Sequence, residues 1–230
     1  MTGSTKVFKT RPGYSLTAAG KLRDSAAARD PVSRQAFTYS VERDSTLVLL
    51  PAPVTCFSRA SYSQRQTFKL APKANLVLLD WFTSGRMDRG ESWDFDLYRS
   101  VNEIWLEERR LARDVTLLKQ DGERSPGTRT SYADRAGPYA CYAALFLYGP
   151  AAAPLVTFYN EAFLAVKQYR QNAPYSMLWS VSSFPDDPSG AIVRCAGADT
   201  ESVKDWLCET LKAAGIEQLI GEDLWKVAFW

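Results

Sequence analysis

The stretch Asn75–Leu97, which reads Asn-Leu-Val-Leu-Leu-Asp-Trp-Phe-Thr-Ser-Gly-Arg-Met-Asp-Arg-Gly-Glu-Ser-Trp-Asp-Phe-Asp-Leu, decides the fold of this chain. Its apolar run Leu76–Leu79 is short and bounded, which predicts a buried strand. After a turn, Trp93–Leu97 alternates apolar and polar residues, the pattern of a half-buried strand. We therefore expect a sheet organised around two strands and the turn between them.

The turn between these two strands combines glycines with charged side chains. Gly85 and Gly90 are expected to adopt positive φ angles, which glycine does without steric cost. Asp80 leaves the first strand, Glu91 enters the second, and Arg86 lies between them. Carboxylates and guanidinium groups are thus expected close together at one end of a sheet. Arginine–carboxylate pairs commonly brace such turns, whereas carboxylate oxygens also bind divalent ions, and both interpretations stay open.

Short apolar or alternating segments predict a mainly β body over residues 1–148, irregular and many-stranded. Within it, Glu103–Glu107 and Leu111–Leu118 are predicted to form two neighbouring strands. Ile104 and Leu106 of the first strand and Val115 and Leu117 of the second are the candidates whose side chains we expect to point into the core.

The last third of the chain, residues 149–230, changes to an α+β pattern. Apolar residues recur at helical spacing in Leu155–Val166 and in Val203–Ala214, which predicts two amphipathic helices. Between them, Met177–Phe184 and Ala191–Cys195 are predicted strands. The order helix, strand, strand, helix suggests a small cap docked on the β body, with the whole chain forming one domain.

Trp206 lies on the apolar stripe of the second predicted helix. Such a stripe usually packs against its own domain. In a protein that works within an assembly, the same stripe can instead contact a partner, so Trp206 is a candidate partner-binding residue.

The composition excludes several classes of function. The chain has no histidine, which removes the commonest general base and nickel ligand. Its four cysteines are scattered among apolar neighbours without a C-x-x-C pair, as expected for buried free thiols. The net charge of +2 gives no broad footprint for nucleic acid. No apolar run approaches a membrane span or a signal peptide, so a cytoplasmic protein without nucleic-acid or membrane partners is expected.

Several segments, taken in order, resemble the urease accessory protein D family (UreD/UreH). The resemblance covers most of the chain, and each segment alone is weakly specific. Its central motif corresponds to Gly85-Arg86 and Gly90-Glu91, with Asp80 five residues ahead of the first glycine. The other resembling segments are Gly3–Lys9, whose Lys6 matches the family's lysine, Leu50–Pro53, and the Tyr62-Ser63-Gln64 that follows.

The resemblance implies a helically wound β body and a non-enzymatic scaffold or chaperone. Such proteins act with accessory protein F and the nickel GTPase, accessory protein G, to insert nickel into apo-urease. No tightly bound cofactor is implied, but a nickel ion in transit is, with Asp80 and Glu91 as its candidate oxygen ligands. The family's upstream Pro-Gly-Gly and Gly-Gly-Asp motifs are missing from this sequence, so a chain lacking an N-terminal part is expected.

Two other classes of function remain open from the sequence. Asp80 and Glu91 could act as acid and base in a carboxylate-dependent hydrolase. The chain could also be a β-structural interaction module that binds proteins without any dependence on nickel.

Overall fold

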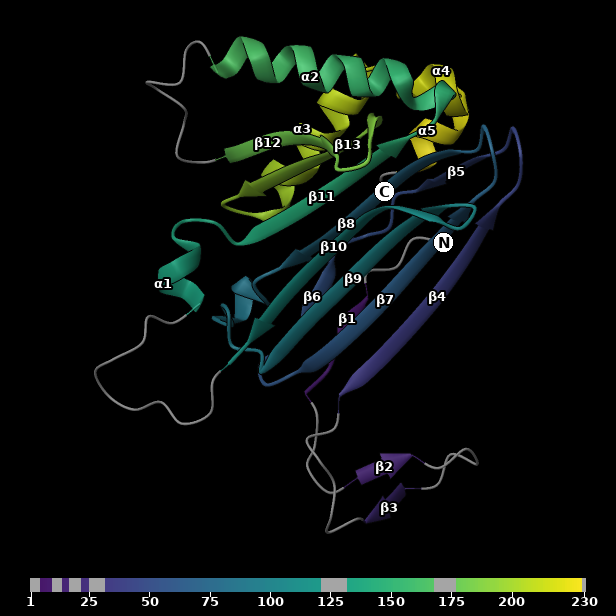
Figure 1. Cartoon of the computed structure of the whole chain (residues 1–230). Helices are drawn as coiled ribbons and strands as arrows, with labels where there is room; N and C mark the ends of the chain where they lie inside the picture. The colour runs from purple at the N-terminus through teal and green to yellow at the C-terminus, as the bar shows by residue number, and fades with distance from the viewer. Residues whose placement is uncertain are drawn as a thin grey trace.

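Two β-sheets pack face to face in this protein, and helices cover the outer face of the larger sheet (Figure 1). The computed structural model describes residues 5–9, 14–16, 22–24, 32–120, 132–167 and 177–228. Strands make up most of the regular structure in these ranges, and parallel and antiparallel pairs both occur. The predicted mainly β fold with helices towards the C-terminus is confirmed.

The larger sheet consists of seven strands: β1 (Lys6–Val7), β5 (Thr46–Leu49), β6 (Val54–Cys56), β8 (Asn75–Thr83), β11 (Cys141–Tyr148), β12 (Met177–Phe184) and β13 (Asp187–Gly197). Their order is β1-β6-β8-β11-β13-β12, and β5 pairs with β8 beside this path. β8 therefore lies near the middle, parallel to β5 and β6 and antiparallel to β11.

The smaller sheet consists of four strands: β4 (Ser33–Val41), β7 (Ser61–Leu70), β9 (Leu97–Leu106) and β10 (Arg109–Lys119). Their order is β10-β9-β7-β4. β9 and β10 form an antiparallel hairpin, whereas β7 runs parallel to both of its neighbours. A separate pair, β2 (Tyr14–Leu16) and β3 (Leu22–Asp24), is antiparallel.

The chain passes repeatedly from one sheet to the other. β4, β7 and β9 belong to the smaller sheet, and the strands between them, β5, β6 and β8, belong to the larger one. Because each return adds a parallel strand to its sheet, the chain winds around the space between the sheets. This winding is the arrangement that the family resemblance implied.

β8 is buried on both faces, which explains its nearly continuous apolar sequence. Leu76 and Leu78 point between the sheets, into a cluster with Phe68 and Ile104. Val77, Leu79 and Trp81 point the other way and pack against the helices. The buried strand predicted from this run is confirmed, and it is longer than predicted because it continues to Thr83.

The helices that pack on the larger sheet lie in the C-terminal third: α2 (Ala153–Lys167), α3 (Thr200–Ala213), α4 (Ile216–Ile220) and α5 (Glu222–Ala228). α2 and α3 confirm the two predicted amphipathic helices. Asp199 caps α3, because its Oδ1 accepts a hydrogen bond from Ser202 N at 2.7 Å. A short helix, α1 (Tyr132–Ala136), precedes β11. No helix in the described parts of the chain is long and apolar enough to cross a membrane.

The two strands predicted for the C-terminal cap both form, but they do not build a separate sheet. β13 pairs with β11 from Cys141 to Leu147, and β12 pairs with β13. These strands therefore extend the larger sheet, and α2 and α3 pack on that sheet rather than on a sheet of their own.

The strand predicted over Trp93–Leu97 is absent, because β9 begins only at Leu97. Trp93 has a φ of 57°, and its N–H donates to Ser84 O at 2.7 Å, which closes a turn. Trp93 and Phe95 are nevertheless buried, together with Tyr98. The alternating apolar residues here therefore hold a loop against the core and do not form a strand.

The inward orientation predicted for Val115 and Leu117 is wrong. Both side chains are among the exposed large apolar ones, at 45% and 56%. A bulge between Arg110 and Ala112 shifts the register of β10 against β9. Because one extra residue reverses which side chains face inward, Asp114 and its alternate neighbours point between the sheets instead.

Candidate functional site

Asp80 projects from β8 into the space between the two sheets, where neutral side chains hold its carboxylate. Oδ1 accepts from Gln64 Nε2 at 2.9 Å. Oδ2 accepts from Ser100 Oγ and from Asn102 Nδ2, both at 2.6 Å. The three donors come from β7 and β9 of the facing sheet, so this carboxylate ties the two sheets together without a cation.

The network continues along β7 towards the edge strand β4. The single proton of the Tyr62 hydroxyl lies between two acceptors, Gln35 Oε1 at 2.6 Å and Gln64 Oε1 at 3.0 Å, measured from the hydroxyl oxygen. On the other side, Gln66 Nε2 donates to Asn102 Oδ1 at 3.1 Å. Polar side chains thus form a continuous layer across the sandwich, next to its apolar core.

The electrostatics of Asp80 follow from this setting. Burial raises the pKa of its carboxyl above the ordinary value, and the hydrogen bonds from Ser100, Asn102 and Gln64 oppose that rise. The nearby carboxylate of Asp114 raises it further. A positive ion at this position would meet a carboxylate that no positively charged side chain neutralises directly.

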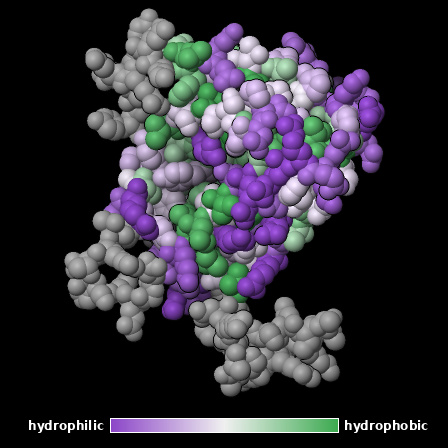
Figure 2. Space-filling view, viewed as in Figure 1, coloured by the Kyte–Doolittle hydropathy of each residue, from purple (hydrophilic) through white to green (hydrophobic). Residues whose placement is uncertain are grey.

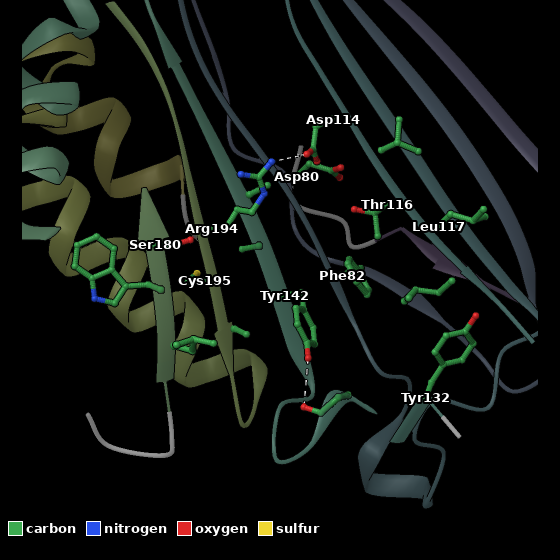
Figure 3. Close-up of a pocket in the computed structure, with 18 of the residues that line it drawn as sticks. Asp80, Phe82, Asp114, Thr116, Leu117, Tyr132, Tyr142, Ser180, Arg194 and Cys195 are labelled. Carbon is green, nitrogen blue, oxygen red and sulfur yellow. Dashed lines mark hydrogen bonds and ion pairs between the residues drawn. The ribbon is translucent and has the colours of Figure 1, made fainter. Parts of the chain in front are cut away.

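A cavity of about 590 Å³ opens beside Asp80, where the two sheets separate (Figure 3). β10 forms one wall, β11, β12 and β13 form the other, and α1 lies at one end. Asp114 enters the cavity from β10 and makes an ion pair of 2.6 Å with Arg194 of β13. Aromatic side chains, among them Phe82, Tyr132 and Tyr142, line the rest.

A second cavity, of about 190 Å³, lies on the opposite side of Asp80. Gln35 and Phe37 of β4, Gln64 and Gln66 of β7, and Pro51 are among its lining residues. Among the residues that the structure describes, Asp80 alone lines both cavities. The carboxylate therefore lies at the partition between two hollow regions of the sandwich.

The turn after β8 is built around an ion pair. Arg86 Nε donates to Glu91 Oε2 at 2.8 Å, and Arg86 Nη2 contacts Glu91 Oε1, a bidentate arrangement. Glu91 Oε2 also accepts from Ser58 N at 3.1 Å. These contacts, with the Arg86 bond first, lower the pKa of the Glu91 carboxyl. The arginine stacks over the Phe57 ring at 3.9 Å, which fixes its position.

Glycine is required at one position of this turn. Gly85 has a φ of 140°, and a Cβ there would lie 2.8 Å from the backbone oxygen of Glu91. Gly90 also has a positive φ, 73°, but faces open space. The prediction that both glycines serve backbone conformations with positive φ is confirmed.

The structure separates the two acidic residues that the sequence placed together. Asp80 lies inside β8, three residues before its end, and points between the sheets. Glu91 is held by the turn and lines neither cavity. The acid–base pair that a hydrolase would need is therefore not assembled by these two carboxylates. Nowhere in the described residues do three Asp, Glu or Cys side chains converge as a metal cluster.

The cysteines are buried or partly buried free thiols within the described chain, as predicted. Burial raises the pKa of Cys56 and of Cys141 to about 12, and it also raises the pKa of Cys195. Thiolate ligands are thus unfavourable near neutral pH.

Two other predicted residues lie away from the cavities. Lys6 is exposed in β1, where it pairs with Thr55 of β6. Gly3 and Ser4 of the same predicted motif lie outside the described residues. Trp206 is half-buried and packs against Trp179 and Tyr159, with ring centroids 5.5 and 6.2 Å away. It contributes to the packing of α3, and its role at a partner surface stays a prediction.

Sequence reasoning missed the polar partners of Asp80 and the second carboxylate of the larger cavity. Gln64 and Gln66 share a face of β7 with buried Phe68, and this pattern of polar residues at inward positions was the available signal. Asp114 gave no such signal. Its inward orientation depends on the bulge in β10, which the alternating sequence does not reveal.

Comparison with known proteins places the chain in a family. It matches the family described as UreD urease accessory protein over residues 1–230. It is 33% identical to urease accessory protein 4 of Cryptococcus neoformans var. grubii over 233 residues, which covers 97% of this chain and 71% of the relative. Urease accessory protein D of Arabidopsis thaliana is 32% identical over 226 residues, covering 90% and 74% respectively. Urease accessory protein UreD of Sorangium cellulosum is 34% identical over 176 residues, covering 76% and 52%.

The matched region includes β8, the turn with Gly85 and Gly90, and the strands that surround Asp80. The wound two-sheet fold and these matches agree with the motifs that first indicated the relationship. The chain belongs to the UreD urease accessory protein family.

Proposed function

We propose that this chain is a non-enzymatic urease accessory protein that helps to insert nickel into apo-urease, in a complex with accessory proteins F and G. Membership of the UreD family supports the role in urease maturation. The specific partners and the nickel step are our inference.

One observation carries the nickel part of this proposal: the Asp80 carboxylate borders both cavities of the sandwich. A divalent ion that moves between these two spaces passes an oxygen ligand held by three neutral donors. With no histidine in the chain and with thiols whose pKa is raised, oxygen ligands are the available ones. Carboxylates hold nickel more weakly than imidazole or thiolate groups, which suits passage better than storage.

Asp114 is a second carboxylate on the same proposed path. It lines the larger cavity, and its charge acts on Asp80. Its ion pair with Arg194 holds it in the cavity next to Asp80 (Figure 3). An ion that reaches Asp80 through this cavity would therefore also pass Asp114, whose charge is already paired with Arg194.

Glu91 remains a proposed nickel ligand, but unlike Asp80 it is already paired with an arginine. Because Arg86 already occupies both of its carboxylate oxygens, nickel must displace the guanidinium before it can bind. We expect this residue to contribute less to nickel transfer than Asp80.

The test is nickel loading of apo-urease by the reconstituted complex with F and G, using Asp80→Ala and, as a matched control, Thr116→Ala. Thr116 lines the same cavity but has no charge. The aspartate variant should assemble, as judged by size-exclusion chromatography, and yet leave urease with little nickel by metal analysis. The threonine variant should load urease normally. If Asp80→Ala assembles and loads urease as wild type does, Asp80 carries no nickel.

A further inference from the structure

The outer face of the four-stranded sheet concentrates positive charge. Alternate residues of β4, β7, β9 and β10 point away from the core, since their neighbours pack between the sheets. Cations occur at these outward positions on every strand: Arg34, Arg65, Lys69, Arg99, Arg113 and Lys119. Glu103 is the one acidic residue among the outward positions of these strands. These six cations and one carboxylate give the named outward positions a net charge of about +5, whereas the whole chain has a net charge of only +2.

Most of these cations have no acidic partner on the face. Among the ion pairs between described residues, only that of Arg113 with Glu103, at 3.1 Å, lies here. Arg65 and Lys69 are exposed on β7, one of the two inner strands of the sheet. Their charges therefore remain available to an approaching surface.

The same face also carries exposed apolar groups. Val115 and Leu117, turned outward by the bulge in β10, are 45% and 56% exposed. Nearer the hairpin end of β9 and β10, Trp105 lies under Arg110, whose guanidinium carbon is 5.7 Å from its ring centroid. Figure 2 shows a broad hydrophilic band across this sheet and a smaller hydrophobic area next to it. Exposed apolar side chains on the edge strand β10, next to a face rich in arginine, agree with the composition of a protein interface, in which arginine is enriched.

We propose that the outer face of the four-stranded sheet is a docking surface for an acidic surface of one of the chain's protein partners. Charge complementarity selects the occupant: uncompensated cations on a flat sheet attract a surface rich in carboxylates. Nucleic acid fits less well, because the exposed valine and leucine have no counterpart on a phosphate backbone. The identity of the partners rests on the proposed function.

The experiment measures binding of purified accessory protein F and of apo-urease to the full chain, and compares wild type with Arg65→Glu/Lys69→Glu. The matched control is Lys212→Glu/Lys226→Glu, which changes the net charge equally on the helices of the opposite layer. Thermal melting establishes that each variant is folded. For one of the two proteins, the sheet variant should bind about tenfold or more weakly, mainly through slower association. Raising salt from about 0.05 M to about 0.5 M should weaken wild-type binding in the same way. The control should bind as wild type does.

A second variant, Leu117→Ser, removes apolar area without changing charge and should speed dissociation of the same partner. The inference is overturned if the sheet variant and Leu117→Ser both bind F and apo-urease as tightly as wild type. It is also overturned if the charge reversal abolishes binding to duplex DNA or RNA while protein binding is unchanged. Wild type that binds neither F nor apo-urease would overturn the proposed function together with this inference. If only the sheet variants lose binding, while wild type and the control bind, the result supports this inference and agrees with the proposed function.

Discussion

Asp80 and Glu91 are two carboxylates eleven residues apart in one motif, and the protein treats them in opposite ways. Asp80 lies inside the sandwich, held by neutral donors from the facing sheet, and burial raises the pKa of its carboxyl. Glu91 lies in the turn, paired with Arg86, which lowers the pKa of its carboxyl. The Asp80 carboxylate therefore has no cationic partner, whereas the Glu91 carboxylate is neutralised by Arg86.

The difference teaches which carboxylate is available for a ligand. A carboxylate that already makes a bidentate pair with arginine satisfies its charge within the protein. A carboxylate held only by amide and hydroxyl donors has no cationic partner within the protein, and reduced solvation disfavours its charged form. Such a group costs folding free energy, and it is the one that attracts a cation. The predictions below test this contrast.

The largest effect on stability is expected from Gly85→Ala. This substitution disrupts the turn that holds Glu91 and leaves the surroundings of Asp80 unchanged. The added Cβ would lie 2.8 Å from Glu91 O, at a φ of 140°. We expect the free energy of unfolding to fall by about 2–4 kcal/mol in urea denaturation. Gly90→Ala is the control, because its Cβ meets nothing within 4 Å, and it should cost only about 1–2 kcal/mol. Equal losses at both positions would contradict the close contact.

Asp80→Ala should have the next largest effect on stability. It leaves donors of Gln64, Ser100 and Asn102 without their acceptor. Unsatisfied buried donors cost about 1–3 kcal/mol, and we expect a total loss of about 2–3 kcal/mol because water from the cavities can reach some of them. The measurement is urea denaturation. A loss no larger than that of Thr116→Ala would show that the network contributes little.

Glu91→Ala should destabilise the protein less than Asp80→Ala does. The Arg86–Glu91 pair is partly solvated, with 30% and 18% of the side chains exposed, so solvent and salt weaken its contribution. The melting temperature should fall slightly, and the difference from wild type should shrink as salt is added. A decrease that does not depend on salt would mean that the carboxylate acts mainly through its hydrogen bond to Ser58.

The smallest effect is on the pH dependence of stability, and it has opposite signs for the two residues. The pKa of Glu91 is lowered by folding, so its contribution is complete above the unfolded-state value of about 4.3 and is lost as pH falls through the folded pKa. The pKa of Asp80 is raised, so the folded state loses stability as pH rises from about 3.9 through the folded pKa.

Urea denaturation of wild type and Asp80→Asn between about pH 4 and pH 7 isolates the Asp80 contribution, since asparagine does not titrate. The free-energy difference, wild type minus variant, should decrease as pH rises over this range. A difference that stays constant would mean that Asp80 has an ordinary pKa in the folded protein.

Much of the fold could be predicted from local patterns. The run around Leu78 and the helical spacing around Leu207 each reflect burial of a whole face, which sequence periodicity records directly. The strand predicted for Trp93–Leu97 was wrong because a loop can also bury alternate aromatic residues. The inward orientation predicted for Val115 was wrong because of a single bulge in β10, where it pairs with β9. After this bulge, each side chain of β10 points to the opposite face of the sheet from the one predicted.

The candidate site was predictable only in part. Asp80 stood out because a carboxylate interrupts an apolar strand, and the glycines stood out because a charged turn needs them. The proximity of Asp114 to Asp80 was not predictable, since it depends on how two sheets stack and where they separate. The neutral donors to Asp80 were not predictable for the same reason, because β7 and β9, which carry them, are adjacent only in the folded sheet.

The winding of the chain between the two sheets has a consequence for its synthesis. β7 needs β9 beside it, and the apolar strand β8 needs β11, which is made more than fifty residues later. Pairings between such distant segments form slowly. While the ribosome is still making residues 84–140, β8 exposes an apolar, unpaired edge, which favours aggregation. We therefore expect yields of this protein to depend on slow translation, low temperature or a chaperone that shields the nascent chain until β11 emerges.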